Sequence, residues 1–438
     1  MVIEVLALSV TFIIFFLHRL RQNLPPGPRP WPIVGNMYQL RPNDFRLLAR
    51  WSNIYGPIAS FRIGSSLCIT VSNPKLAKEV LKDHDQLLAN RHRTIGIARF
   101  SRNGDDLTWA DYGLKFVKLK KLCVVEFFSP KNLEAHKFGR ENEISVMIDS
   151  ITKDSFGKVL VVKNCLKKTT FNIVATMIFG NSFVDSNGEL DSEGWELIAI
   201  MEAQFRAKVS LGIVEEVGWL RWLSWLKDDE NKQIQSRNHR FFQAAIHKKE
   251  KQNCTDHRNF NFLDALLSRC EEYNLSDDTI SGLLWDMVTA GIDTTVIVVE
   301  WAMTELVINP TVQRKVQEEL DKVIGLLPFG SGRRVCPGAQ LAMNLVSLMV
   351  GRLLHHFEWS LPEGFRAEEI DMIEMLGIVA YKKVPLEVHK LQPGSHIGLP
   401  TATIGLPYPA LEWPNLTAEL QLKLRKRQNP STPVLIFV

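Results

Sequence analysis

Paired and regularly spaced cysteines are absent from this sequence. Its six cysteines, at positions 68, 123, 165, 254, 270 and 336, form no C-x-x-C pair. This distribution argues against a disulfide scaffold or a zinc site and is typical of a reducing compartment. A large excess of one charge is also absent, because 52 basic and 48 acidic residues are interspersed along the chain. The balance does not indicate a nucleic-acid-binding protein.

Internal repeats, low-complexity blocks and a convincing inner domain boundary are missing as well. The chain has 438 residues, 45% of them hydrophobic, so it can bury a large core as one domain or as two or three smaller ones. Apolar residues at spacings of three and four predict mostly helix between residues 129 and 257. Short strands are expected at 58–63 and 67–71, so the pattern is mainly α with a small β-sheet.

The N-terminus carries one long apolar run. Residues 2–17 are almost wholly apolar, interrupted by Glu4, and a basic cluster follows at 18–21. A cleaved signal peptide is the competing interpretation, but the charges follow the apolar run and no small-x-small cleavage site is present. This charge placement predicts an uncleaved membrane anchor over 1–21, with the rest of the chain in the cytosol.

Residues 22–36 contain prolines too densely spaced for a helix, and they predict a stiff, extended connector. A ligand for an SH3-type domain is the alternative, but the segment joins the predicted anchor directly to the body of the protein. Further on, the cap at Ser276 predicts a long helix that runs to about Ile308 and ends at Asn309-Pro310.

The segment from Phe329 to Gly338 places Cys336 in a glycine-punctuated loop before an amphipathic helix expected over 339–355. Glycines let the backbone curl closely around the sulfur. A thiolate at a helix N-terminus beside Arg333 and Arg334 is expected to have a lowered pKa and to be a good metal ligand. A lone cysteine is otherwise most often an inert buried side chain.

The spacing Phe-x-x-Gly-x-Arg-x-Cys-x-Gly is matched at every fixed position, by Phe329, Gly332, Arg334, Cys336 and Gly338. This loop resembles the haem-binding loop of the cytochrome P-450 superfamily. The resemblance implies a P-450-like helical fold, with Cys336 as the axial thiolate ligand of a haem b iron. It also implies that the loop residues bind the cofactor and that Arg334 pairs with a haem propionate. Such a thiolate favours O–O cleavage.

The run Ala290-Gly291-Ile292-Asp293-Thr294-Thr295 lies within the long predicted helix. Glycine, an acid and two β-branched alcohols are poor helix formers, and their hydroxyls can loosen a helix by bonding back to its carbonyls. On these residues alone a kinked core helix is an equal alternative. The run resembles the oxygen-activation groove of the P-450 family, which implies that Thr294 hydrogen-bonds dioxygen and Asp293 relays protons.

Another segment departs from the family pattern. Members carry Trp-x-x-x-Arg on a helix that reaches a haem propionate, and the corresponding positions here are Phe116 and Lys120. Lys120 still supplies positive charge, without the bidentate fork of arginine. Phe116 lacks the indole N–H donor. The other lysines of this segment, 115, 118 and 121, are otherwise typical of a solvated helix face.

The long stretch that family members have before the cysteine loop is absent, including the Glu-x-x-Arg helix (the K-helix) and several strands of the main sheet. Thr294 and Cys336 are only 42 positions apart. Glu363 to Arg366 spells Glu-x-x-Arg, but it follows the cysteine and is interpreted as a chance match. The predicted organisation is therefore a haem-thiolate domain over 37–390 with an internal deletion near 325–327. A tail unrelated to the family, expected to be poorly ordered, covers 391–438.

At finer grain the chain resembles the plant family that hydroxylates the ring of 4-coumaroyl shikimate or quinate esters. The stretches that carry this likeness are 100–104, 109–113 and 282–287. The resemblance implies an endoplasmic-reticulum monooxygenase of phenylpropanoid metabolism that uses O2. Its electrons come from NADPH through a flavoprotein reductase, for which the basic faces around Lys118, Lys121 and Arg333 are candidate docking sites. The alternative hypothesis is a membrane-tethered remnant that cannot hold haem and acts at most as a binding partner.

Overall fold

The computed structural model describes residues 24–40, 45–64, 66–153, 159–185, 189–216, 228–251, 261–309, 329–362, 364–375 and 379–391. Three sequence-based predictions fall outside these ranges: the anchor over 1–21, the deletion junction near 325–327, and the tail beyond residue 391. Within them, the helices and strands are α2 (Phe45–Tyr55), β1 (Ile58–Ile63), β2 (Ser66–Val71), α3 (Pro74–Lys78), the π-helical η1 (Glu79–Asp83), α4 (Asp85–Leu88), α5 (Ile95–Phe100), α6 (Leu114–Glu126), α7 (Pro130–Ala135), α8 (Lys137–Lys153), β3 (Val159–Val161), α9 (Val162–Phe179), α10 (Ser192–Glu216), α11 (Asp228–Lys251), α12 (Phe262–Ser268), α13 (Cys270–Tyr273), α14 (Asp277–Ile308), the 3-10 turn η4 (Gly332–Arg334), α16 (Ala339–His356), β4 (Glu358–Ser360), the 3-10 turn η5 (Ala367–Glu369), β5 (Glu374–Met375), β6 (Tyr381–Lys382) and β7 (Glu387–Leu391).

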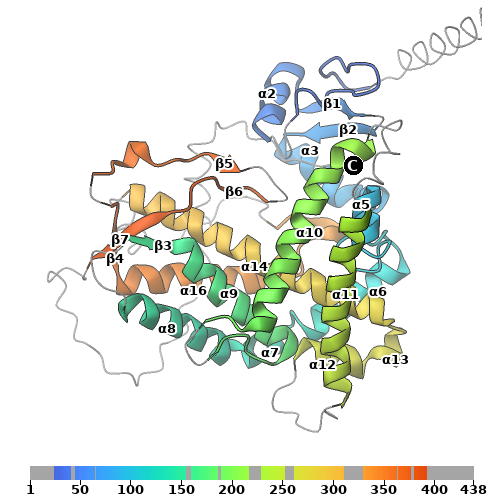
Figure 1. The fold of residues 1–438 in the computed structure, drawn as a ribbon. Helices are drawn as coiled ribbons and strands as arrows, with labels where there is room; N and C mark the ends of the chain where they lie inside the picture. Colours follow the sequence, from blue (N-terminus) through green and yellow to red (C-terminus); the bar gives the residue numbers. More distant parts are fainter. Residues whose placement is uncertain are drawn as a thin grey trace, which may run out of the picture.

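The molecule is built around α14, which packs along α9 and α16 in the centre of the helical body (Figure 1). Its N-terminus is capped as predicted, because the Ser276 side chain accepts a hydrogen bond from the Thr279 N–H at 3.1 Å. Among the described residues α14 is the one helix long and apolar enough to cross a membrane, but most of its residues are buried inside the protein.

The two parts of the chain on either side of residues 310–328 share this core. Leu345 and Val350 of α16 and Val388 of β7 lie in the same buried cluster as Phe171 and Val299 of the preceding helices. Complete burial of a large apolar side chain contributes about 1.5–3 kcal/mol to folding. The segment that carries Cys336 is therefore bound to the helical body by apolar packing.

Polar contacts fasten the C-terminal strands to α14. The Glu300 carboxylate, which is fully buried, accepts the Leu386 N–H at 3.1 Å. The neighbouring Trp301 indole donates to the Ala380 carbonyl at 3.2 Å. The pKa of Glu300 is raised, chiefly because burial disfavours the carboxylate. These contacts fix the start of β7, which lies between β3 and β4 in a small antiparallel sheet.

β1 and β2 form an antiparallel hairpin with no further strand paired to it among the described residues. The outer edge of β1 is not bare, because the proline-rich connector lies along it. The Ser60 N–H donates to the Pro26 carbonyl at 2.9 Å, and Asn36 both donates to and accepts from the backbone of Arg62. The connector is therefore part of the N-terminal lobe, the region that contains α2, β1 and β2.

Candidate active site around Cys336

Two left-handed glycines shape the loop before α16. Gly330 has φ +73° and Gly332 has φ +68°, a region that favours glycine. A Cβ on Gly332 would overlap the Leu81 carbonyl, whereas a Cβ on Gly330 would meet open space. The Cys336 N–H donates to the Phe329 carbonyl at 3.0 Å and closes the loop. These contacts hold the cysteine just before the first turn of α16.

The Cys336 side chain is exposed, and the Gly338 N–H donates a hydrogen bond to its sulfur. The sequence predicted a lowered pKa for this thiol, and that prediction is wrong. Partial desolvation by the surrounding protein is the largest influence and raises the pKa of Cys336, while the Gly338 N–H and the charge of Lys120 oppose it. The positive groups lie close to the sulfur, but they do not outweigh the loss of water around it.

Arg334 turns away from solvent and stacks over the Phe116 ring, with its guanidinium carbon 3.9 Å from the ring centroid. The guanidinium donates to three backbone carbonyls: those of Ala89 at 2.8 Å, Leu107 at 3.4 Å and Ala110. Burial and repulsion by Arg91 lower the pKa of Arg334 to about 10, so it remains a cation at neutral pH.

Lys120 of α6 lies beside the same loop. Its ammonium donates to the Arg333 carbonyl at 2.6 Å. Burial, followed by repulsion from Arg334, lowers the pKa of Lys120, and the Cys336 sulfur acts in the opposite direction. The structure therefore brings Phe116, Lys120 and Arg334 together, with Lys120 beside Cys336, although they come from distant parts of the chain.

Arg333 clamps the outside of the loop through partners that the sequence did not reveal. Its side chain donates to the Asp85 carboxylate at 3.0 Å and to the Tyr112 hydroxyl at 2.7 Å. The Arg333 N–H donates to the other Asp85 oxygen at 2.9 Å. No local pattern signals this clamp, because Asp85 lies about 250 positions earlier in the chain.

α14 contributes one exposed stripe to an otherwise buried helix. Ala290, Thr294 and Val298, spaced four residues apart, are exposed, while Ile292 and Thr295 between them are buried. The Thr294 hydroxyl donates to the Ala290 carbonyl at 2.6 Å. The back-bonding predicted from the sequence is therefore present, but it does not loosen the helix, since α14 is continuous from Asp277 to Ile308.

Asp293 lies on a different side of α14 from the exposed stripe. It is half-buried, and the charges that act on it come from Lys167 and Lys163 of α9 and Glu202 of α10. Desolvation is the largest influence and raises the pKa of Asp293. A carboxyl group with a raised pKa holds its proton to higher pH than a solvated aspartate does and can take part in proton exchange.

Asp286 is a structural residue of the site that sequence reasoning missed. This buried carboxylate accepts the N–H groups of Leu107 at 2.8 Å and Thr108 at 2.9 Å. It thereby fixes the loop whose carbonyls receive Arg334. An acid in the middle of an apolar helix was the available signal.

The residues around Cys336 fit a haem. Lys120, Arg334 and Arg91 gather positive charge, since Arg91 lowers the pKa of Arg334 and Arg334 lowers that of Lys120. Cations that repel one another in a half-buried site favour a bound group with negative charges, such as the two propionates of haem. A single exposed sulfur that accepts a backbone N–H is the donor that a thiolate-ligated haem needs.

Comparisons with known proteins identify the family. The family described as "Cytochrome P450" matches residues 25–326 and 324–386, two blocks that meet at 324–326. "Cytochrome P450 98A2" of Glycine max is 41% identical, covering 84% of this chain and 92% of that protein. "Cytochrome P450 98A1" of Sorghum bicolor is 38% identical, covering 87% and 94%.

Solved structures support the fold independently of close sequence similarity. A zebrafish cytochrome P450 determined with progesterone matches with a TM-score of 0.65 and 18% sequence identity. The match covers 79% of this chain and 99% of the zebrafish chain. The mainly helical fold with small sheets that the sequence predicted is therefore confirmed.

Proposed function

This chain belongs to the cytochrome P450 family, and on that premise we propose that it is a haem-dependent monooxygenase that hydroxylates the aromatic ring of a phenolic, 4-coumaroyl-ester-like substrate. The observation that carries the proposal is the loop around Cys336. Its sequence matches the family pattern at every fixed position, and its sulfur is exposed beside a backbone N–H and Lys120. An inert structural cysteine would need none of these features.

Cys336 would ligate the haem iron, with Phe329, Gly332 and Gly338 shaping the loop around the sulfur. Arg334 and Lys120 would receive the propionates. When bound, the haem supplies the one-electron and O2 chemistry of the reaction. The protein contributes the thiolate, whose electron donation favours O–O cleavage, and the positive charge that retains the cofactor.

Two residues of α14 would take part in hydrogen bonding and proton transfer. The Thr294 hydroxyl lies on the exposed stripe. It can donate a hydrogen bond to the substrate O2 in place of the Ala290 carbonyl. Asp293, which faces the lysines of α9, would pass protons from that side of the helix. Because the two residues lie on different sides of the helix, Thr294 would position the O2 and Asp293 would supply protons.

The substrate class is supported by three stretches, 100–104, 109–113 and 282–287, which resemble plant ring hydroxylases of 4-coumaroyl esters. They come together in space, because Asp286 on the third stretch accepts N–H groups of the segment between the first two. A shared location supports a common role in substrate recognition.

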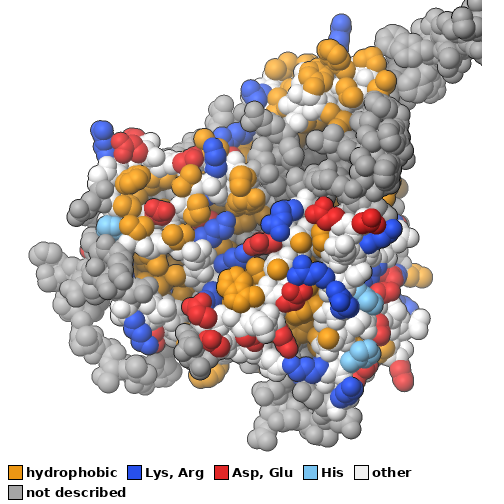
Figure 2. Space-filling view, in the orientation of Figure 1, with side chains coloured by type: hydrophobic (Ala, Val, Ile, Leu, Met, Phe, Trp, Pro, Cys, Tyr) orange, Lys and Arg blue, Asp and Glu red, His pale blue; other side chains and the backbone are white. Residues whose placement is uncertain are grey.

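Electrons would come from NADPH through a separate flavoprotein reductase. Lys118, Lys121 and Arg333 are exposed near the cysteine loop and offer a basic face to an acidic partner. A location at the endoplasmic-reticulum membrane is supported by the predicted anchor. Exposed apolar side chains in the N-terminal lobe, among them Trp31 and Ile54, also support it, and Figure 2 shows hydrophobic side chains gathered there.

The test is a carbon-monoxide difference spectrum of the reduced, membrane-expressed chain, with Cys336→Ala as control. A red-shifted Soret band that is lost in the variant is the expected result. Turnover of 4-coumaroyl shikimate and quinate with a plant reductase would then test the substrate class. A band only at the thiolate-free position, or no haem, would contradict the proposal and favour the inactive remnant.

A further inference from the structure

A second candidate binding site lies where α9, α10, α11 and α12 meet. It is a cavity of about 170 Å³. Its lining residues are Phe179, Asn181, Phe183, Glu193, Phe241, Ala244, Ala245, Lys248, Lys249 and Leu263. None of them belongs to the loop around Cys336 or to α6, α14 or α16, which form the proposed active site.

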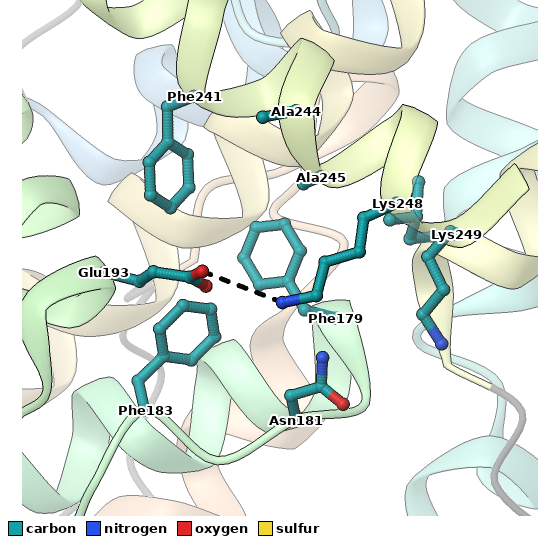
Figure 3. Close-up of a pocket in the computed structure, with 10 residues that line it drawn as sticks. Phe179, Asn181, Phe183, Glu193, Phe241, Ala244, Ala245, Lys248 and Lys249 are labelled. Carbon is teal, nitrogen blue, oxygen red and sulfur yellow. Dashed lines mark ion pairs between the residues drawn. The ribbon is translucent and has the colours of Figure 1, made fainter. Parts of the chain in front are cut away.

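Aromatic rings form the walls of this cavity. The Phe179 and Phe183 centroids are 5.6 Å apart in an edge-to-face contact, and those of Phe179 and Phe241 are 6.4 Å apart. Figure 3 shows Phe241, Ala244 and Ala245 along α11, with the rings of Phe179 and Phe183 beneath them. Fully buried Phe242 packs behind them at 5.5 Å from Phe241, so the walls are supported by the core.

The polar groups of the cavity come from opposite sides. The Lys248 ammonium extends across it toward Glu193, with a separation of 3.7 Å between nitrogen and oxygen (Figure 3). Both side chains are more than half exposed, so this ion pair contributes little to stability and can accept a ligand at low cost. Lys249 does not take part in this pair, since its ammonium forms an ion pair with the largely buried Asp264 at 3.3 Å.

These features select a neutral phenol. An apolar cavity of about 150 Å³ accommodates benzene, so a single aromatic ring fits within 170 Å³. A hydroxyl group can donate to the Glu193 carboxylate and accept from the Lys248 ammonium at once. A benzoate would be attracted by the Lys248 ammonium but repelled by the Glu193 carboxylate. A purely apolar ring would form no hydrogen bond with either group.

We propose that this cavity is a peripheral binding site for a monocyclic phenol, with its ring among Phe179, Phe183 and Phe241 and its hydroxyl between Glu193 and Lys248. The site goes beyond the proposed monooxygenase activity and does not depend on haem. Its occupant would join the ends of α9, α10 and α11.

The experiment is a fluorine NMR titration of the full chain in lipid nanodiscs with 4-fluorophenol, fluorobenzene and 4-fluorobenzoate, corrected with empty nanodiscs. The Cys336→Ala variant is titrated in parallel so that binding at the proposed active site is recognised. We expect 4-fluorophenol to bind about five-fold more tightly than fluorobenzene, the value of one net hydrogen bond, in both proteins.

Two variants locate the site. Ala244→Leu fills the cavity from an exposed position of α11 and is expected to weaken 4-fluorophenol binding about ten-fold, the effect of excluding the ring. Lys248→Met removes the hydrogen bond that the hydroxyl accepts and should weaken 4-fluorophenol binding, while the bond to Glu193 remains. Ser236→Leu and Lys251→Met are matched controls, because they introduce the same residues at exposed positions of α11 outside the cavity.

Circular dichroism confirms that each variant is folded before it is titrated, and Lys248→Met keeps the test available if Ala244→Leu does not fold. Equal affinity for 4-fluorophenol and fluorobenzene would overturn the proposal, as would tighter binding of 4-fluorobenzoate. An equal loss of binding in the control variants would do the same. Loss of haem would leave the expected binding results unchanged. A failure of the proposed monooxygenase function can therefore be distinguished from a failure of the proposed phenol site.

Discussion

The Arg334 guanidinium carries five N–H donors in a fixed fork. Three of its nitrogens each donate to one backbone carbonyl, which leaves a second N–H on each terminal nitrogen. The residue can therefore organise the surrounding loops and still offer donors to an anion. Lysine at this position would keep the charge and lose the fork, which is the difference already present at Lys120.

Asp293→Asn is expected to lower turnover and to stabilise the fold at neutral pH. Turnover should fall at least about 100-fold, the lower range for loss of an acid–base group. The pKa of Asp293 is raised above its ordinary value of 3.8 in the folded chain, so the folding stability associated with its protonated form is present below that value. That stability is lost as pH rises through the folded pKa, whereas the amide does not ionise.

The thermal midpoint of Asp293→Asn should therefore exceed that of the parent chain increasingly as pH rises above about 4, until the folded carboxyl is fully ionised. Differential scanning calorimetry across this range measures the difference. Asp149→Asn, at an exposed position of α8, is the control and should show no such trend. A constant or negative difference for Asp293→Asn would show that desolvation does not govern this carboxyl.

At the scale of elements, α14 shows how packing overrides local preference. Gly291 and Thr295 weaken a helix in isolation, yet α14 passes through them unbroken. Gly291 lies close to α9, where an added Cβ would be 3.2 Å from Val174. The small residue therefore serves close helix packing, and burial supplies the stability that its helix propensity lacks.

The two glycines of the cysteine loop provide a matched pair of substitutions. Gly330→Ala should cost about 1–2 kcal/mol, the strain of a left-handed alanine. Gly332→Ala should cost more, because its Cβ also overlaps the Leu81 carbonyl and forces the loop away from η1. Chemical unfolding measures both changes. Equal losses would mean that the loop can shift without disturbing the Arg333–Asp85 contact.

At the scale of the whole molecule, the connector determines whether β1 has a free edge. An exposed strand edge can pair with another chain, and here Pro26 and Asn36 occupy that edge. Asn36 is fully buried and also donates to the Arg29 carbonyl at 3.2 Å. The N-terminal lobe is thus completed by a segment that composition alone describes as a linker.

Removal of residues 1–23 should leave the thermal midpoint nearly unchanged, whereas removal of 1–36 should lower it and promote association. The longer truncation deletes the partners of Ser60 and Arg62 and uncovers the β1 edge. Calorimetry and size-exclusion chromatography with light scattering compare the two. If both truncated chains behave alike, the connector does not protect β1.

Much of the fold was predictable from local patterns. The boundaries of α14 and the cap at Ser276 follow from capping and periodicity. The helix after the cysteine loop was predicted to within one residue of its end at His356. The helix capped by Asn73 could not be delimited in this way, since α3 ends at Lys78 and the chain continues as a π-helical turn.

The candidate site was predictable in its residue types and not in its contacts. The pattern around Cys336 predicts a metal ligand and the residues beside it, because the loop spans ten consecutive residues. The acceptors of Arg334 are backbone carbonyls more than 220 positions away, and backbone atoms carry no sequence signal. The predicted direction of the Cys336 pKa shift was wrong for a related reason. Desolvation depends on everything packed around the sulfur.

Helix caps, glycine turns, the apolar face of α14 and the haem-loop pattern each depend on residues that are close together in the chain. The sequence alone therefore determines them. Burial, electrostatic neighbours and edge coverage arise when distant segments meet, and their energies depend on atoms that adjacent residues do not specify. The clamp of Arg333, the raised pKa of Asp293, the cover on β1 and the phenylalanine-lined cavity therefore belong to the folded molecule.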